Sequence, residues 1–156
     1  MRVSAKTDYA LQAMAELARA PEGEQRKAEQ ISNAQDIPLK FLMAIMNELK
    51  RARLVRSQRG AEGGFALARP ASEITLADVI RAVDGPLANI HDSSLGDMAY
   101  PGPAEPLREV WMAVRASLRS VLEGVTLDDL ASRQLPEPVR SMAASYRADT
   151  RVRYPS

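Results

Sequence analysis

The chain has 156 residues, 46% of them hydrophobic, and a formal net charge of +1, which fits one globular domain or one domain with an extension. No apolar run approaches the ~20 residues that cross a bilayer, and the first residues, MRVSAKTDYA, lack the apolar stretch of a signal peptide, so we expect a cytoplasmic protein without a membrane partner. With no cysteine, a single histidine and no Ser-His-Asp, HExxH or phosphate-loop pattern, the sequence excludes disulfides and the common catalytic motifs, and we expect no enzyme, no metal site and no cofactor.

The first 38 residues predict two helices and a tight break. Ser4 can cap the first helix, whose apolar residues recur on one stripe: Leu11, Met14, Leu17 and Ala18. Residues 21–23, PEG, end this helix. A short second helix covers roughly residues 27–35 and is expected to face inward with Ala28, Ile31 and Ala34. Residues 36–38, DIP, form the break, and Pro38 suits the first turn of a new helix.

The third helix, residues 38–51, has a clear two-faced pattern. Its inward residues stand at helical spacing: Leu42, Ile45, Met46 and Leu49. The opposite face carries Lys40, Met43, Asn47 and Lys50. After Arg53 the apolar period changes from 3.6 to 2, which predicts a hairpin with strands at 54–59 and 65–69. Glycines 60, 63 and 64 lie between these strands, and Val55, Phe65 and Leu67 offer an apolar face toward the helices.

The second half of the chain predicts an interrupted segment between helices. Thr75 and Asp78 can open a fourth helix that ends at Gly85, with Leu76, Val79, Ile80 and Val83 inward. Glycines and prolines interrupt residues 86–105, which we interpret as a linker or sensor loop. A long amphipathic helix at 106–123 and a short one from Thr126 follow, and residues 136–156 form a flexible or partly helical tail. The expected units are therefore 1–85, 86–105, 106–135 and 136–156.

The order of the first elements is that of a winged helix-turn-helix, a mainly α fold with a two-stranded wing. Residues 40–69 hold seven basic and two acidic side chains, so their local charge is +5 and the remainder of the chain carries −4. Such a basic stretch suits a polyanion, although a solvated face is the plainer interpretation. A helix fits the major groove, and an arginine at the wing tip, Arg59, can enter a narrow minor groove. The wing glycines can equally serve the turn alone.

Three segments resemble one known family. The segments MRVSAKTDYALQAMAELA, residues 28–85 and GVTLDDL are similar to the Rrf-type family of bacterial winged helix-turn-helix regulators over roughly residues 1–133. The most specific part is the pattern from Leu42 or Met46 through Phe65, with LVRSQRGAEGGF at its end. The family includes regulators that bind iron–sulfur clusters, sense nitric oxide or repress cysteine metabolism.

The resemblance implies a homodimeric transcriptional regulator that binds double-stranded DNA at a near-palindromic operator. We interpret the regulator as a repressor. It implies base-reading positions at or beside Leu39, Lys40, Phe41 and Met43, and a minor-groove role for Arg59. With the other exposed or basic positions of the third helix and wing, the candidate DNA-binding residues are Leu39, Lys40, Phe41, Met43, Asn47, Lys50, Arg51, Arg56, Arg59 and Gly60.

The chain departs from the cluster-binding members of that family. Those members carry three cysteines before the long helix, whereas this loop has none, and Leu107 or Arg108 stands where one relative places a ligand histidine. Asp8, which matches a cluster ligand of one branch, is interpreted as an ordinary acidic residue of a first helical turn. His91, Asp92 and Asp97 could in principle bind a metal, but a solvated loop explains them as well. We expect any regulation to act through residues 91–106 without iron.

The long helix predicts a second partner, another copy of the chain. A buried core helix would show the same periodicity, but a lone amphipathic helix of this length needs a partner, and two-fold self-association is the simplest one. The candidate dimer residues are Leu107, Val110, Trp111, Val114, Leu118 and Val121. Two alternatives to a DNA-binding dimer remain: an interaction module that docks a metabolic enzyme, such as one of cysteine biosynthesis, and, ranked last, an enzyme. A small-molecule effector is a further partner to consider.

Overall fold

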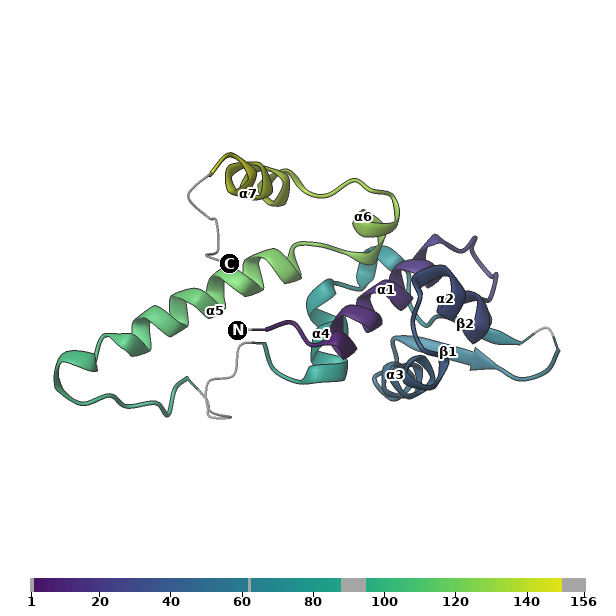
Figure 1. Cartoon of the computed structure of the whole chain (residues 1–156), viewed down its shortest axis with the longest axis horizontal. Helices are drawn as coiled ribbons and strands as arrows, with labels where there is room; N and C mark the ends of the chain where they lie inside the picture. The colour runs from purple at the N-terminus through teal and green to yellow at the C-terminus, as the bar shows by residue number, and fades with distance from the viewer. Residues whose placement is uncertain (1, 62, 88–94, 150–156) are drawn as a thin grey trace.

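The computed structural model describes residues 2–61, 63–87 and 95–149, and within them the fold is mainly helical (Figure 1). The elements, in chain order, are α1 (Ala5–Arg19), α2 (Ala28–Gln35), α3 (Leu39–Arg51), β1 (Val55–Gln58), β2 (Gly64–Leu67), α4 (Leu76–Asp84), α5 (Leu107–Glu123), α6 (Leu127–Ala131) and α7 (Glu137–Ala148). The predicted helices and the hairpin are therefore confirmed, with ends that differ by one or two residues.

Side-chain caps set the beginnings of three helices. The Ser4 hydroxyl accepts a hydrogen bond of 3.0 Å from the Thr7 backbone N–H and so begins α1. Thr75 and Asp78 form a reciprocal capping box on α4, with bonds of 3.1 and 3.0 Å. Thr126 and Asp129 repeat the same arrangement on α6. These short polar groups satisfy the free N–H groups of a first turn, which is why local sequence predicts them.

The core lies between α1, α3 and α4 and is closed by α2 and the base of the wing. All four predicted inward residues of α3 are buried: Leu42, Ile45, Met46 and Leu49. The expectation for Ala34 in α2 is wrong, because that side chain is exposed. The inward stripe of α2 continues from Ile31 to Gln35, four residues on, and the Gln35 amide donates to Glu16 of α1.

Residues from the far end of the chain complete this core. Leu127 of α6 is fully buried among the residues of the first four helices. The backbone there pairs with the start of α4, because Leu76 N–H donates to Val125 at 3.0 Å and Leu127 N–H donates to Ile74 at 2.9 Å. The expected unit 1–85 therefore omits one part of its own core, the segment at 125–127. The pairing joins segments about fifty residues apart, which local periodicity does not reveal.

A polar cluster fixes α1 to the end of α4. The buried Thr7 hydroxyl donates to the Asp84 carboxylate, and Ser4 donates to the same carboxylate at 3.0 Å. A hydroxyl buried in this way needs a partner, and Asp84 supplies one. The last turn of α4 is thereby held in place immediately before Gly85.

The wing is a two-stranded antiparallel sheet in which Val55 lies opposite Leu67 and Ser57 opposite Phe65. Val55 is buried and Phe65 and Leu67 are half-buried against the core, as predicted. A further backbone bridge joins Arg26 to Phe65, with hydrogen bonds of 2.9 and 2.8 Å. This close approach explains Gly64, since a Cβ there would lie 2.6 Å from the Arg26 carbonyl oxygen.

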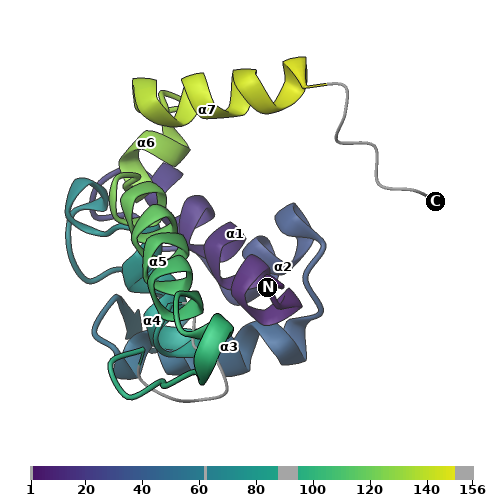
Figure 2. The same ribbon diagram turned by 90° about the vertical axis from the view of Figure 1, so that its left-hand side faces the viewer.

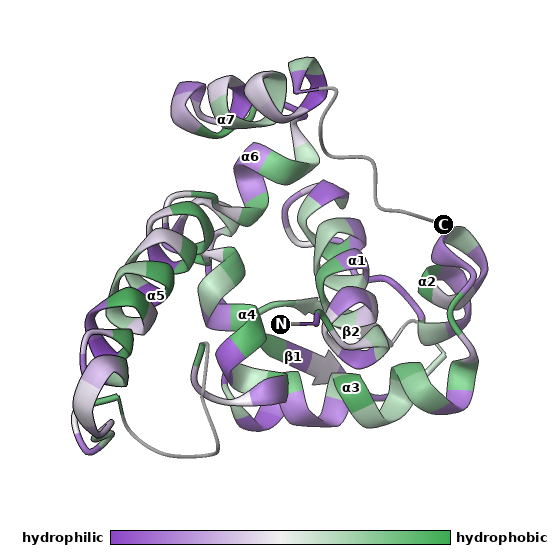
Figure 3. Ribbon diagram, turned by 60° about the vertical axis from the view of Figure 1, so that its left-hand side comes forward, coloured by the Kyte–Doolittle hydropathy of each residue, from purple (hydrophilic) through white to green (hydrophobic). Residues whose placement is uncertain are grey.

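Helices α5 and α7 lie outside the core. Neither helix has a buried residue, and the wing and α5 extend from opposite sides of the body (Figure 1). Figure 2 shows α7 beyond α6, on the side away from α3. Hydrophobic and hydrophilic residues alternate along α5 (Figure 3). The long predicted helix is thus present and amphipathic; within one chain it contacts α4, and its apolar side chains are half-buried or exposed.

Candidate nucleic-acid interface

The tight break between α2 and α3 is built from three consecutive residues. Asp36 adopts a left-handed backbone conformation, with φ of 52°, which asparagine and aspartate tolerate better than most residues. Ile37 is buried, its N–H donates to the Ser32 carbonyl at 3.0 Å, and the Ser32 hydroxyl donates back to the Ile37 carbonyl at 2.6 Å. Pro38 then precedes the first turn of α3. These contacts fix the direction of α3 against α2.

The outer face of α3 is apolar near its beginning and polar near its end. Three large hydrophobic side chains are exposed there, Leu39 at 40%, Phe41 at 64% and Met43 at 39%. Lys40 is exposed among them, and Asn47, Lys50 and Arg51 are exposed further along. The structure therefore brings all seven candidate residues of α3 to the surface. Such a face can contact thymine methyl groups with its apolar part and phosphates with its basic part.

The basic side chains of this region have few acidic neighbours. All seven, from Lys40 to Arg69, are exposed. The Glu48 carboxylate forms an ion pair with the Lys6 ammonium group of α1, with 2.8 Å between nitrogen and oxygen. The Arg69 guanidinium group lies 3.9 Å from the Asp78 carboxylate. Among the residues that the structure describes, no carboxylate pairs with the remaining six: Lys40, Lys50, Arg51, Arg53, Arg56 and Arg59. Unneutralised cations on one region attract a polyanion more strongly than internally paired ones do.

The wing presents Arg59 and Gly60 at its outer end, where both are exposed. Gly60 has φ of 109°, a conformation that favours glycine. Arg56 is placed differently, because side chains alternate along a strand. Ser57 receives a hydrogen bond of 3.1 Å from Lys50, whereas Arg56 lines a cavity together with Glu22 and Glu24. The structure thus groups Arg59 and Gly60 at the tip and separates Arg56 from the Lys50 side of the wing.

Two positioning contacts have no signal in the sequence. The Lys50–Ser57 hydrogen bond joins the last turn of α3 to β1. On the other side of the wing, Gln25 donates to the Gln58 side chain. Together these contacts connect the wing to α3 and to the segment before α2. Side-chain bonds between elements depend on the packed fold, so spacing along the chain does not predict them.

The candidate dimer residues lie along α5 with graded exposure. Leu107 is 39% and Val110 is 50% exposed, while the other four are half-buried: Trp111, Val114, Leu118 and Val121. Met112, which is not among the predicted dimer residues, is 49% exposed. Arg108 at the beginning of α5 donates to the Leu95 and Gly96 carbonyls at 3.3 and 3.1 Å, which connects the middle of the 86–105 segment to the helix.

The residues present do not fit a thiolate-held cluster. The chain contains no cysteine, and soft sulfur ligands are what hold such clusters. Within the described ranges, no three His, Asp or Glu side chains gather as a metal site would require. Asp8 instead accepts a hydrogen bond of 2.7 Å from Gln12 in the first turn of α1. His91 and Asp92 lie outside the described residues, and Asp97 is exposed.

No helix in the described part of the chain combines the length and apolar character needed to cross a bilayer.

Comparison with known proteins identifies the family. The model of the Rrf2 family, described as "Iron-dependent Transcriptional regulator", matches residues 3–133. An HTH-type transcriptional regulator of Mycobacterium tuberculosis H37Rv, Rv1287, is 51% identical over 154 residues, 99% of this chain and 96% of the relative. The regulator CymR of Bacillus subtilis is 34% identical over 132 residues, 85% of this chain and 91% of CymR.

Solved structures agree with these sequence relatives. The structure of CymR, the global cysteine regulator of B. subtilis, matches with a TM-score of 0.73 and 33% identity over 85% of this chain and 98% of CymR. IscR of T. potens matches with a TM-score of 0.70 and 29% identity over 85% of this chain and 88% of IscR. The fold of the described residues, mainly helical with a two-stranded wing, is a winged helix-turn-helix fold that matches these two structures. The chain belongs to the Rrf2 family of transcriptional regulators.

Proposed function

We propose that the protein is a homodimeric repressor that reads a near-palindromic operator, with α3 in the major groove and the wing tip along the adjacent minor groove. The observation that carries this proposal is the set of six exposed basic side chains on α3, on the wing and on the turn between them, none of which has an acidic partner among the described residues. The tight break at 36–38 supports the orientation, because it fixes α3 with its exposed face outward. A helix begins its contacts to base edges near its N-terminus, where Leu39, Lys40 and Phe41 are exposed.

Dimerisation through α5 supplies the two-fold symmetry. The helix has 17 residues and none is buried within one chain, although most of the stability of a helix comes from packing its amphipathic face. Pairing two copies of α5 covers its apolar stripe and repeats α3 in a second orientation. Two α3 helices must then be spaced about one turn of DNA apart, ~34 Å, so that each reads one half-site.

The decisive experiment is a gel-shift and footprinting assay on DNA from the protein's own promoter region. Arg59→Ala should weaken binding about tenfold, equivalent to ~1.4 kcal/mol, because Arg59 is an exposed tip residue aimed at a minor groove. Its thermal stability should stay unchanged. Arg147→Ala is the matched control, since Arg147 is equally exposed but lies on α7. Equal binding by Arg59→Ala and the parent would remove the minor-groove role.

Failure of the parent protein to bind any promoter fragment would favour the alternative, an interaction module that docks a metabolic enzyme. Because phosphate contacts release counterions, binding should also fall steeply with salt. Binding that does not change with salt would contradict a role for the six basic side chains.

The proposal includes repression without an iron–sulfur cluster. The chain lacks the thiolate donors that such a cluster requires. Protein purified without oxygen should therefore be colourless, absorb nothing beyond the aromatic band and bind its operator. A brown, iron-containing preparation would contradict this part of the proposal and would direct attention to carboxylate and histidine ligands.

A further inference from the structure

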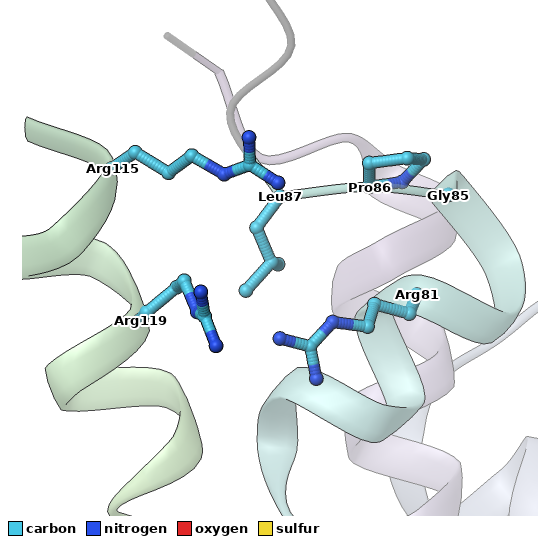
Figure 4. Close-up of a pocket in the computed structure, with 6 residues that line it drawn as sticks. All are labelled: Arg81, Gly85, Pro86, Leu87, Arg115 and Arg119. Carbon is cyan, nitrogen blue, oxygen red and sulfur yellow. The ribbon is translucent and has the colours of Figure 1, made fainter. Parts of the chain in front are cut away.

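Three arginines from two helices surround a cavity of about 490 Å³ beside the end of α4. Arg81 comes from α4, Arg115 and Arg119 come from α5, and residues 85–87 also line the cavity (Figure 4). Figure 4 shows the Arg81 and Arg119 guanidinium groups directed toward each other and Arg115 reaching across the cavity toward Leu87. This volume lies within the ~300–1,000 Å³ of small-molecule pockets.

The charges around this cavity do not balance. The Glu123 carboxylate accepts hydrogen bonds from Arg81 and, at 3.1 Å, from Arg119. Asp78, at 4.0 Å from Arg81, is shared with Arg69. In the described part of the chain Arg115 has no carboxylate partner, and its Nε is buried without a hydrogen-bond acceptor. Among the described residues, three arginines and one glutamate leave a charge of +2 and a buried donor that needs an acceptor.

These features define the chemistry of a ligand. A planar guanidinium binds carboxylate or phosphate oxygens through two parallel N–H donors. The charge of +2 calls for a dianion, and the wall formed by Pro86 and the buried Leu87 leaves space for a short apolar part. We infer that this cavity binds a small organic or inorganic dianion, a dicarboxylate or a phosphate, that bridges Arg115 of α5 to Arg81 of α4.

The location suggests what binding does, and this step rests on the proposed function. Asp84 fastens the end of α4 to α1 of the DNA-binding part, whereas α5 is the proposed dimer helix. A ligand that holds α4 to α5 therefore sets the angle between the reading helix and the dimer axis. Since half-site spacing must match a turn of DNA, the dianion acts as an effector of operator affinity.

The test is titration calorimetry on the full chain with succinate and with inorganic phosphate, and with acetate as a monoanion. Saturable binding of either dianion, stronger than that of acetate, is expected. Arg115→Gln should weaken it about tenfold because one bidentate partner is lost. Glu123→Gln should strengthen it, because the charge of the cavity rises to +3. Arg147→Gln, an arginine on α7, is the control and should change nothing.

Absence of saturable binding for both dianions overturns the inference, as does equal affinity of the parent, Arg115→Gln and Arg119→Gln. Circular dichroism and thermal melting of each variant show whether the fold is retained, and Glu123→Gln gives a gain of affinity that misfolding cannot mimic. Dianion binding without any operator binding would overturn the proposed function but leave the site intact. Operator binding that saturating succinate or phosphate does not change would overturn the effector role.

Discussion

At the scale of single residues, Phe41 is the most informative side chain of α3. An aromatic ring that is 64% exposed near the beginning of a helix gains little from burial in the free chain, and the proposed operator contact would cover it. The C5-methyl group of thymine is the apolar feature of the major groove. Phe41→Ala should weaken operator binding roughly fourfold per contacted methyl, since burial of one such group is worth ~0.8 kcal/mol.

Operators in which single thymines are replaced by uracil make this measurement specific, because uracil lacks only the methyl group. The parent protein should lose affinity at the contacted positions, and Phe41→Ala should be indifferent to the replacement. Met142→Ala, which removes a side chain of 50% exposure from α7, serves as the control. Equal uracil sensitivity in the parent and Phe41→Ala would assign the methyl contact to another residue.

The roles of single residues were predictable from the sequence where they depend on neighbours a few positions away in the chain. The caps at Ser4, Thr75 and Thr126 satisfy N–H groups three residues away, and a buried stripe on α3 follows from helical spacing. The inward position of Gln35 in place of Ala34 was not predictable, because it depends on Glu16 of another helix. The meeting of Arg81 and Arg119 at Glu123 also depends on tertiary packing, since residues 86–105 separate the two arginines in sequence.

At the scale of elements, the contact between α4 and α5 depends on pH through Glu123. Hydrogen bonds from Arg81 and then Arg119 hold the pKa of the Glu123 carboxyl below its ordinary value of 4.5. A lowered native pKa means that the carboxylate stabilises the fold above pH 4.5, and that this contribution is lost as the pH falls through the native pKa. Glu123→Gln should therefore lower the free energy of unfolding at neutral pH and have a diminishing effect under acid conditions.

Urea unfolding of the parent and Glu123→Gln at several pH values measures this convergence. Glu109→Gln is a suitable control, because Glu109 is an exposed acid on the same helix for which the described residues show no ion pair. The stability difference between the parent and Glu123→Gln should disappear once the carboxyl is protonated. A difference that stays constant down to acid pH would show that the glutamine disturbs packing instead of removing a charge.

Element types were predictable from the sequence, but their grouping was not. The change from helical to strand period after Arg53 predicts the wing, and the sustained stripe at 106–123 predicts α5. The return of residues 125–127 to the first core was hidden, because α6 has only five residues, too few for a periodic pattern to show which side chain is buried. The bridge from Arg26 to Phe65 is hidden for the same reason, since a single backbone pairing leaves no periodic pattern.

At the scale of the whole molecule, the proposed dimer depends on α5, none of whose residues is buried within one chain. Val110 is 50% exposed on the apolar stripe, so in a dimer a charge there would have to be buried without a partner. Val110→Glu should therefore shift sedimentation equilibrium from dimer to monomer. Ala116→Glu is the matched control, because at 100° per residue Ala116 lies on the opposite side of the helix.

Val110→Glu should also change operator binding, because a monomer contacts fewer phosphates than a dimer does. A monomer presents one α3 and one wing, so Val110→Glu should bind a single half-site as well as the parent but lose the advantage of the full operator. Because each phosphate contact contributes to the salt dependence, the slope of log affinity against log salt on the full operator should fall to about half. A monomeric variant that retained the parent's affinity and salt slope on the full site would show that one chain reads it alone. Ala116→Glu should keep both the dimer and the steep slope, so that only loss of the second α3 accounts for the change.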